Sequence, residues 1–332
     1  MHHRQRGDAT PMLTRRSILW TALLGAVGAH AAAFPDKPIR LVVPYAPGGG
    51  TDTWARLYAA RLSNALHTPV IVENRPGAST QVGANYVAKA EPDGYTLLFT
   101  SGTHIQVPAL TLNVAYDVQR DFAPVGQLGT TGLIFVVNPE VKATNMKEFF
   151  AEAKKADKDK WALGTYAAGS TGAVFSQLMG REQGLNMPVV VYKGESLAIT
   201  DVVGGQIQGG FFSIPSVKSL AKAGKLRAIG NLATERAAAF PELPTLVEQG
   251  LPRYRWPGVW LGVFAPAKTP QPVLDRLADA SHAITQDPAF QAEWGERDVT
   301  VAWRSPSQFR NDIRSDMATW AEMIQTLGIK PE

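Results

Sequence analysis

Four short segments of the sequence combine glycine with serine or threonine and have the composition of an anion-binding site. They are residues 46–51 (APGGGT), 100–103 (TSGT), 167–172 (AAGSTG) and 193–196 (KGES). Glycine lets a backbone approach a ligand closely, and the free amides at the start of a helix favour negative charge. These segments therefore predict capture of a carboxylate or phosphate by neutral donors. A tight strand-to-helix turn has the same composition, so the pattern alone leaves both interpretations open.

Nucleotide binding and nucleophilic catalysis are two other functions that such segments suggest. The glycine run 48–50 has neither the lysine of a phosphate loop nor the spacing of a dinucleotide fingerprint. Ser170 lies between Ala168 and Gly172 in a variant of the nucleophile elbow, and His104 follows another of the segments. An exported hydrolase that uses Ser170 and His104 is therefore the alternative to a binding protein.

Metal and cofactor chemistry have little support in the sequence. Beyond the first 31 residues the histidines are His67, His104 and His282, and neither they nor nearby carboxylates have the spacing of metal ligands. The chain contains no cysteine, which excludes disulfides, thiolate metal sites and a lipidated N-terminal cysteine. We therefore expect no metal and no cofactor.

The N-terminus has the pattern of an export signal. Arg15 and Arg16 precede an apolar stretch at 18–27, and the segment 29–31 (AHA) then supplies small residues where a signal peptidase cleaves. We expect residues 1–31 to be a signal peptide and the mature protein to be periplasmic. The paired arginines also resemble a twin-arginine signal, so the export route stays open. The start codon stays open as well, because Met1 and Met12 both precede the arginines.

The charge and hydropathy of the mature chain exclude two classes of function. Cleavage after residue 31 removes four arginines and one aspartate and lowers the formal net charge from +4 to +1. With no block of lysine or arginine left, nucleic-acid binding is unsupported. No later apolar run approaches the roughly 20 residues that span a bilayer, so we expect the mature protein to be soluble.

The loops must be positioned by the elements on either side of them, and these elements alternate between strand and helix patterns. The first third is predicted as a β-α-β-α-β unit with strands at 39–45, 69–73 and 95–99 and helices at 54–65 and 81–90. This alternation is typical of an α/β protein with a largely parallel sheet.

A second unit of the same kind follows Asn138-Pro139. It is predicted to contain strands at 161–165, 187–192, 206–212 and 226–233 and helices at 147–155, 171–183, 196–203 and 216–223. Two further helices close the chain, at 272–285 and after the capping box Ser305-Pro306-Ser307-Gln308.

Two similar units predict two lobes. The apolar strands at 133–137 and 260–264 are expected to cross between them and to form a two-strand hinge. Lobe one would then comprise residues 32–137 and 259–332, and lobe two residues 138–258.

Eight stretches of the sequence, in this order and spacing, closely resemble one protein family. They are 34–40 (FPDKPIR), 43–52 (VPYAPGGGTD), 73–78 (ENRPGA), 88–98 (AKAEPDGYTLL), 121–125 (DFAPV), 192–194 (YKG), 204–206 (GGQ) and 241–245 (PELPT). The chain resembles the solute receptors of tripartite tricarboxylate transporters, the Bug family, from Phe34 to Lys330.

The resemblance implies a type II periplasmic-binding-protein fold, in which two α/β lobes close over a ligand. It implies a receptor, not an enzyme, that delivers a small carboxylate solute to membrane transporter subunits. The family binds amino acids, di- and tricarboxylates, aromatic acids and some uncharged solutes. A solute sensor that signals to a membrane partner would use the same fold. We expect a monomer that does not bind nucleic acid.

The resemblance also implies which residues hold the ligand. In lobe one these are Tyr45, Gly48, Gly49, Thr51, Asp52, Ser101, Thr103 and His104, and in lobe two Gly169, Ser170, Thr171, Gly172, Lys193, Gly194 and Asp201. Asp52 is expected to order its own loop and to meet a ligand amine or hydroxyl group, and its alternative role is to cap the following helix. The chain departs from the family pattern at Ser79-Thr80, Val107-Pro108, Ser196-Leu197 and Gln208, so the identity of the ligand does not carry over.

Overall fold

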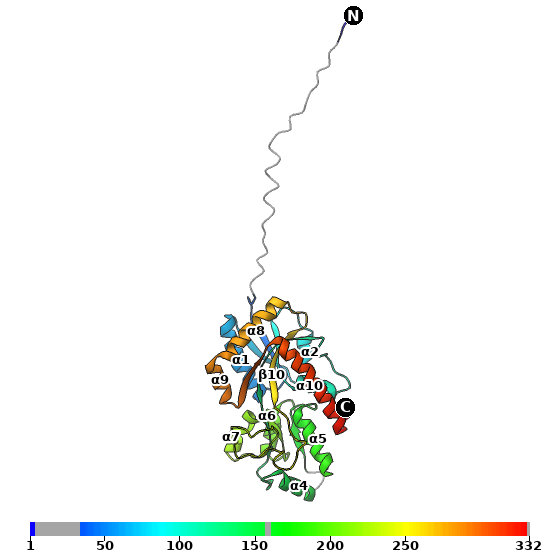
Figure 1. Cartoon of the computed structure of the whole chain (residues 1–332), viewed down its shortest axis with the longest axis vertical. Helices are drawn as coiled ribbons and strands as arrows, with labels where there is room; N and C mark the ends of the chain where they lie inside the picture. Colours follow the sequence, from blue (N-terminus) through cyan, green and yellow to red (C-terminus); the bar gives the residue numbers. More distant parts are fainter. Residues whose placement is uncertain (4–33, 157–160, 331–332) are drawn as a thin grey trace. The chain divides into compact units, whose positions relative to one another are not determined.

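The computed structural model describes residues 1–3, 34–156 and 161–330 (Figure 1). The chain separates into two units, Met1–Asp36 and Lys37–Glu332, and the second unit contains the helices and strands of the described residues. From residue 4 onward, the expected signal peptide lies outside the described residues. In the described part of the chain, no helix is both long and apolar enough to cross a membrane.

The first sheet of the described chain has the strand order β11-β4-β10-β3-β1-β2. Its strands are β1 (Ile39–Val43), β2 (Val70–Asn74), β3 (Thr96–Ser101), β4 (Phe122–Thr131), β10 (Val259–Pro266) and β11 (Val299–Arg304). Strand β1 runs parallel to β2 and β3, whereas β10 is antiparallel to both β3 and β4. Strand β11 is antiparallel to β4 at the edge.

The second sheet of the described chain has the order β7-β6-β8-β5-β9. Its strands are β5 (Leu133–Val137), β6 (Leu163–Thr165), β7 (Val189–Val191), β8 (Gly209–Ser213) and β9 (Arg227–Asn231). Strand β6 is parallel to β7 and β8, and β5 is antiparallel to β8 and β9. The expectation of largely parallel sheets is therefore wrong, because the strands nearest the crossing between sheets run against their neighbours.

Helices cover both sheets (Figure 1). Against the first sheet lie α1 (Gly50–Leu66), α2 (Gln81–Ala88), α8 (Gln271–Gln286) and α10 (Pro306–Leu327), with α9 (Pro288–Gly295) beside β11 and α3 (Thr103–Gln106) after β3. With the second sheet pack α4 (Met146–Lys155), α5 (Thr171–Gln183), α6 (Glu195–Val203) and α7 (Ile214–Lys222). The bounds of α5 match its predicted range, and the predicted capping box of α10 is confirmed, since Ser305 Oγ accepts from the Gln308 amide.

Two segments connect the sheets, and they cross side by side. Strand β4 continues into β5 through Gly132, and the chain returns to β10 through Gly258, whose Cβ position would lie 3.2 Å from the Thr131 carbonyl oxygen. Gly258 has a φ of +131°, which a side chain would strain. Residues 133–137 pair within the second sheet, so the change of sheet falls at Gly132, earlier than the expected boundary after residue 137.

Helix α10 packs into the cores of both sheets. Near its start, Phe309 and Ile313 join a cluster with Trp260 from the first sheet. Farther along, Trp320 joins the cluster of the second sheet and lies 5.2 Å from Trp256, measured between ring centroids. The helix is therefore a further connection between the two halves of this unit.

Candidate functional site

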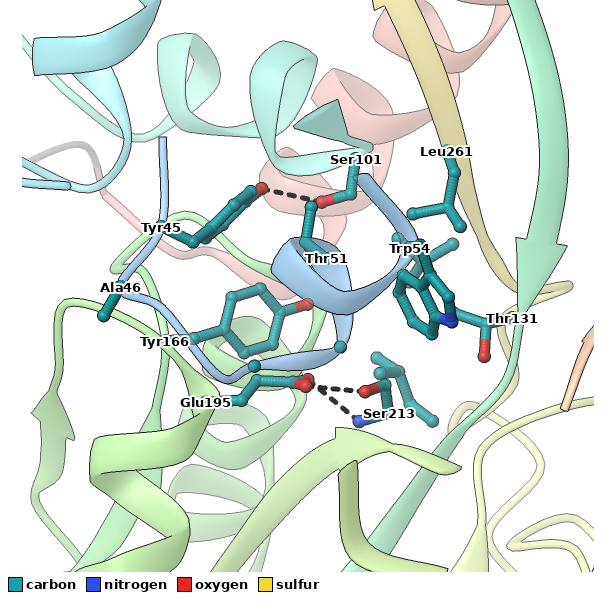
Figure 2. Close-up of a pocket in the computed structure, with 14 residues that line it drawn as sticks. Tyr45, Ala46, Thr51, Trp54, Ser101, Thr131, Tyr166, Glu195, Ser213 and Leu261 are labelled. Atoms are coloured by element: carbon teal, nitrogen blue, oxygen red, sulfur yellow. Dashed lines mark hydrogen bonds between the residues drawn. The ribbon is translucent and has the colours of Figure 1, made fainter. Parts of the chain in front are cut away.

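The strand-to-helix junctions of the two sheets meet at a small cavity (Figure 2). Its volume is about 20 Å³, close to what one water molecule requires. The residues that line it come from both sheets and both crossing segments. They are Tyr45, Ala46, Gly49, Gly50, Thr51, Trp54, Ser101, Thr131, Leu133, Tyr166, Glu195, Ser213, Val259 and Leu261.

Tyr45 and Ser101 form the hydroxyl wall of the first lobe. Tyr45 follows β1 and Ser101 ends β3, so two neighbouring parallel strands bring them together, and their hydroxyl oxygens lie 2.7 Å apart. Burial raises the pKa of Tyr45, although hydrogen bonds with Ser101 and Thr100 oppose that rise. The tyrosine therefore stays neutral and presents a hydroxyl group to the cavity.

The N-terminus of α1 forms the next part of the wall. Gly49 is its N-cap residue and has extended backbone angles, and Gly50 and Thr51 begin the helix. The first amides of a helix have no partner within it and carry partial positive charge. One of them is already engaged, because the Gly50 amide donates to Ser216 Oγ of α7 at 3.0 Å.

Glu195 is the acidic side chain of the cavity, and it comes from the second lobe. Its Oε1 accepts from the Ser213 amide at 2.9 Å, and its Oε2 accepts from the hydroxyls of Ser213 and Ser216, each at 2.6 Å. Burial raises the pKa of Glu195, whereas the serines and the Gly50 amide stabilise its ionised form. Tyr166 lies beside it, and burial together with the Glu195 charge raises the pKa of this tyrosine well above its usual value.

Four of the expected site residues line the cavity: Tyr45, Gly49, Thr51 and Ser101. Thr103 lies behind them, with its hydroxyl oxygen 3.2 Å from that of Ser101. The sequence-based set is therefore brought together on the side of the first lobe.

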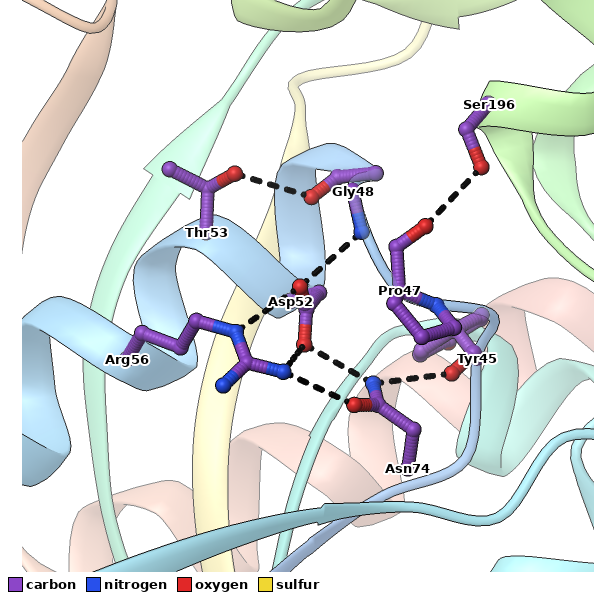
Figure 3. Close-up of polar contacts among 9 residues, drawn as sticks. Tyr45, Pro47, Gly48, Asp52, Thr53, Arg56, Asn74 and Ser196 are labelled. Atoms are coloured by element: carbon purple, nitrogen blue, oxygen red, sulfur yellow. Dashed lines mark hydrogen bonds and ion pairs between the residues drawn. The ribbon is translucent and has the colours of Figure 1, made fainter.

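Gly48 and Asp52 form a network that orders the loop, away from the cavity lining (Figure 3). Asp52 accepts from the Gly48 amide at 2.9 Å, from Arg56 Nε at 3.0 Å and from Asn74 Nδ2 at 2.8 Å. Although burial would raise the pKa of Asp52, the hydrogen bonds from Arg56, Gly48 and Asn74 lower it below its ordinary value. The structure thus favours the loop-ordering role for Asp52 over ligand contact.

His104 points into the aromatic core, where its ring stacks on Tyr116 and lies against Phe122 and Phe264. Neither ring nitrogen has a hydrogen-bond partner among the described residues, and burial lowers its pKa to about 3. Ser170 caps α5 by accepting from the Ala173 amide. The histidine and serine of the hydrolase alternative are therefore not hydrogen-bonded to each other.

The remaining expected residues of the second lobe pack or bridge the lobes, and the cavity lining contains none of them. The Lys193 carbonyl accepts from the Ala46 amide at 2.9 Å, and Thr171 Oγ1 accepts from Gln106 Nε2 at the same distance. A Cβ atom at Gly169 would lie 2.7 Å from Val107 Cα, and one at Gly194 would lie 3.1 Å from Ala46. Within the second lobe, Gly172 packs on Phe211 and Asp201 accepts from the Tyr192 hydroxyl.

Several cavity residues were missed from the sequence. Glu195 follows Gly194 within one of the four glycine-rich segments, and Tyr166 and Ser213 lie at or after the ends of β6 and β8. Their positions at the ends of strands could have indicated that they lie at the site, because ligands bind at the carboxyl ends of strands in α/β sheets. Leu133 and Leu261 lie in the two strands expected to cross between the lobes, whereas no comparable signal marked Thr131 and Val259, which reach the cavity beside them.

Comparison with known proteins gives a consistent result. The family described as tripartite tricarboxylate transporter family receptor matches residues 54–329. Protein BugT of Bordetella pertussis is 31% identical over 307 residues, which cover 92% of this chain and 94% of BugT. An R. palustris structure with adipate is 28% identical, with a TM-score of 0.85 and coverage of 90% and 100%. MatC from Rhodopseudomonas palustris with bound malate is 28% identical, with a TM-score of 0.83 and coverage of 88% and 100%.

Proposed function

Because the chain belongs to the family of tripartite tricarboxylate transporter receptors, which are periplasmic solute-binding proteins, we propose that the cavity between its two sheets is its solute site. A small carboxylate-bearing solute binds there and is handed to the membrane subunits of a tripartite tricarboxylate-type transporter. The receptor reaches the periplasm through the signal at residues 1–31 and works as a monomer.

The observation that carries this proposal is the convergence of neutral hydroxyl groups from both lobes on one cavity. Tyr45 and Ser101 approach from the first lobe and Tyr166 from the second (Figure 2), whereas the Ser213 hydroxyl already donates to Glu195. Hydroxyl groups can donate to a carboxylate without bringing a compensating charge. A solute that touches both walls binds best when the lobes lie close together, in an arrangement slightly more open than the one described, whose cavity holds only about one water molecule.

We propose two roles for the expected site residues. Tyr45, Gly49, Thr51 and Ser101 contact the solute, and Thr103 supports Ser101. The residues of the second lobe that touch the first lobe, namely Gly169, Thr171, Lys193 and Gly194, hold the closed arrangement. Among the described residues we propose one lobe of residues 37–132 with 259–330 and a second within residues 133–258, since β5 pairs in the second sheet.

The size of the cavity implies that the lobes separate before a solute enters. Relatives are described with adipate and malate, and neither molecule fits a volume of about 20 Å³. The crossing at Gly132 and Gly258 offers the place for rotation, because domain closure turns on a few residues between rigid elements.

The proposal is tested by purifying the protein from periplasm and identifying the solute that it carries. Native mass spectrometry before and after denaturation is expected to release a small carboxylic acid. Adding that acid to ligand-free protein should raise the melting temperature, as expected for a ligand that binds only the folded state. If no solute is recovered and no carboxylic acid in a broad panel changes the melting temperature, the proposed function is wrong.

Delivery to a transporter needs a separate measurement. Cells that lack this gene should lose uptake of the identified acid, and the restored gene should recover it. Uptake that persists without the gene would contradict a transport role while leaving solute binding intact.

A further inference from the structure

A buried acid faces the cavity in which a carboxylate is proposed to bind. Glu195 lines that cavity, and its lining contains no lysine, arginine or histidine. The hydrogen-bond donors around the Glu195 carboxylate are neutral: the amide of Ser213 and the hydroxyls of Ser213 and Ser216. A second carboxylate next to it would meet a like charge with no cation to offset the repulsion.

Glu195 also occupies the position that the sequence assigned to the solute. The Gly50 amide, in the first turn of α1, stabilises the Glu195 carboxylate and donates to Ser216 as well. The N-terminus of α1, where an anion is favoured, therefore already faces a carboxylate of the protein itself. The carboxylate of a solute must find its donors elsewhere in the cavity.

The other end of the cavity offers such donors. In Figure 2 the pair Tyr45–Ser101 lies on the side opposite the pair Glu195–Ser213, with Thr51 and Tyr166 between them. A carboxylate at the Tyr45–Ser101 end would be separated from Glu195, and the far end of the same solute would then meet Glu195. The group at that far end must therefore be able to donate a hydrogen bond to the Glu195 carboxylate.

We propose that Glu195 selects solutes that carry a hydrogen-bond donor, an ammonium or hydroxyl group, at the end opposite their carboxylate. This inference rests on the proposed receptor function and narrows its substrate class. A simple dicarboxylate is disfavoured because its second carboxylate would face Glu195. Replacing Glu195 by glutamine keeps the size of the side chain and removes its charge, so the preference should change without loss of packing.

Three probes matched in chain length test this inference: 4-aminobutyrate, 4-hydroxybutyrate and succinate. Titration calorimetry on the parent should give at least one donor-bearing probe about tenfold or more tighter binding than succinate, since a hydrogen bond to a charged group contributes that much. In Glu195→Gln, succinate should gain about tenfold and the donor-bearing probes should lose a similar factor. Asp201→Asn is the matched control, because Asp201 lies on the same helix outside the cavity lining and should leave the preference unchanged.

Several outcomes would overturn the inference. Succinate binding to the parent as tightly as both other probes would do so, as would an unchanged preference in Glu195→Gln with a parent-like melting temperature. The solute that co-purifies with the parent is an independent readout. If none of the three probes binds, the chemical groups of this solute show whether Glu195 selects a hydrogen-bond donor. A carboxylic acid without any ammonium or hydroxyl group contradicts the role of Glu195 while supporting the receptor function. Absence of every bound solute, together with a melting temperature that no carboxylic acid changes, contradicts the receptor function itself.

Discussion

Burial favours the neutral form of several ionisable side chains of this protein, among them His104 and Glu195. His104 is enclosed by Tyr116, Phe122 and Phe264, and its pKa falls to about 3. Glu195 is enclosed at the cavity, and its pKa rises even though three serine donors favour its charge. The histidine has no polar partner among the described residues, whereas the acid has several. Of these two side chains, only Glu195 therefore has hydrogen-bond partners that stabilise a charge when a solute binds.

The histidine makes stability depend on pH. Its pKa is about 3 in the folded protein and near the ordinary 6.5 in the unfolded chain, so between these values the unfolded chain binds more protons. The free energy of unfolding should therefore fall as pH drops below 6.5, by up to about 1.4 kcal/mol per pH unit. His104→Phe, which suits the aromatic cluster, should lose about 2 kcal/mol less than the parent between pH 7 and pH 5.

Urea unfolding at both pH values measures this difference. His282→Gln, at an exposed position, should behave like the parent because it leaves His104 in place. Equal pH dependence in the parent and His104→Phe would show that His104 is not buried as described.

Residue type in the sequence indicated which loops of the first lobe lie at the cavity but not the direction of each side chain. Tyr45, Gly49, Thr51 and Ser101 line the cavity, because their loops follow neighbouring strands. His104 belongs to the same loop region, yet α3 turns its ring into the core. A sequence shows that a polar residue is near a junction, whereas packing decides which way it faces.

At the scale of elements, the N-terminus of α1 has two adjacent glycines that differ sharply in the space around them. A Cβ at Gly50 would lie 2.9 Å from both Ser213 Oγ and Trp54 Cη2, whereas at Gly49 the nearest atom would be 3.9 Å away. Gly49 also has a negative φ of −81°, which alanine adopts without strain. Comparing alanine variants at these two glycines therefore separates the effect of an added methyl group from the effect of disturbing the contact between the lobes.

We expect Gly50→Ala to weaken solute binding by about tenfold to a hundredfold, because overpacking of about 1–3 kcal/mol acts on the closed form. Gly49→Ala should stay within about twofold of the parent by the same reasoning. Titration calorimetry with the identified solute provides the comparison, and melting temperatures show whether each variant folds. Equal affinities for the two variants would mean that the contact between Gly50 and the second lobe does not limit binding.

Elements with a strong local sequence pattern could be predicted from the sequence, whereas strands whose geometry depends on pairing with distant strands could not. The predicted helix at 171–183 and the capping box at Ser305 are confirmed, since apolar spacing and cap chemistry are local. Strand β4 carries Pro124 and two glycines and is buried along nearly its whole length, so it shows no alternation. Its strand geometry comes from pairing with β10 and β11, which are distant in the sequence.

At the scale of the whole molecule, direct contacts hold the two lobes together around the cavity. Besides the Ala46–Lys193 and Gly50–Ser216 hydrogen bonds, the Ala168 amide donates to Ser79 Oγ at 3.1 Å. Lys218 of α7 forms an ion pair with Asp298 beside β11 at 2.8 Å. Solute exchange must break these contacts, whereas the connections through Gly132, Gly258 and α10 can persist.

An engineered disulfide between Gly49→Cys and Glu195→Cys should lock the lobes in the closed arrangement. The Cβ position at Gly49 lies 4.0 Å from Glu195 Cβ, within the range of disulfides. The parent has no cysteine, so the new pair has no competing thiol. The oxidised protein should exclude added solute, and a reducing agent should restore binding, weaker than in the parent because Glu195 is absent, as measured by calorimetry on the same preparation.

Small-angle scattering gives a second measurement of this lock. The reduced protein should show a smaller radius of gyration when solute is added, and the oxidised protein should show the compact value throughout. Solute entry that is equally fast in the two redox states would mean that the lobes need not separate.

The atoms that join the lobes also bear on how such a receptor diversifies. The Ala46–Lys193 contact runs between main-chain atoms, and the Gly50 and Ala168 contacts each use a main-chain amide. Main-chain groups persist through nearly every substitution, so mutation can alter Glu195, Tyr166 or Ser213 without removing these donors. If the proposed function holds, the main-chain donors that join the lobes persist while the side chains around the cavity change, so related sequences can keep one way of closing and bind different solutes.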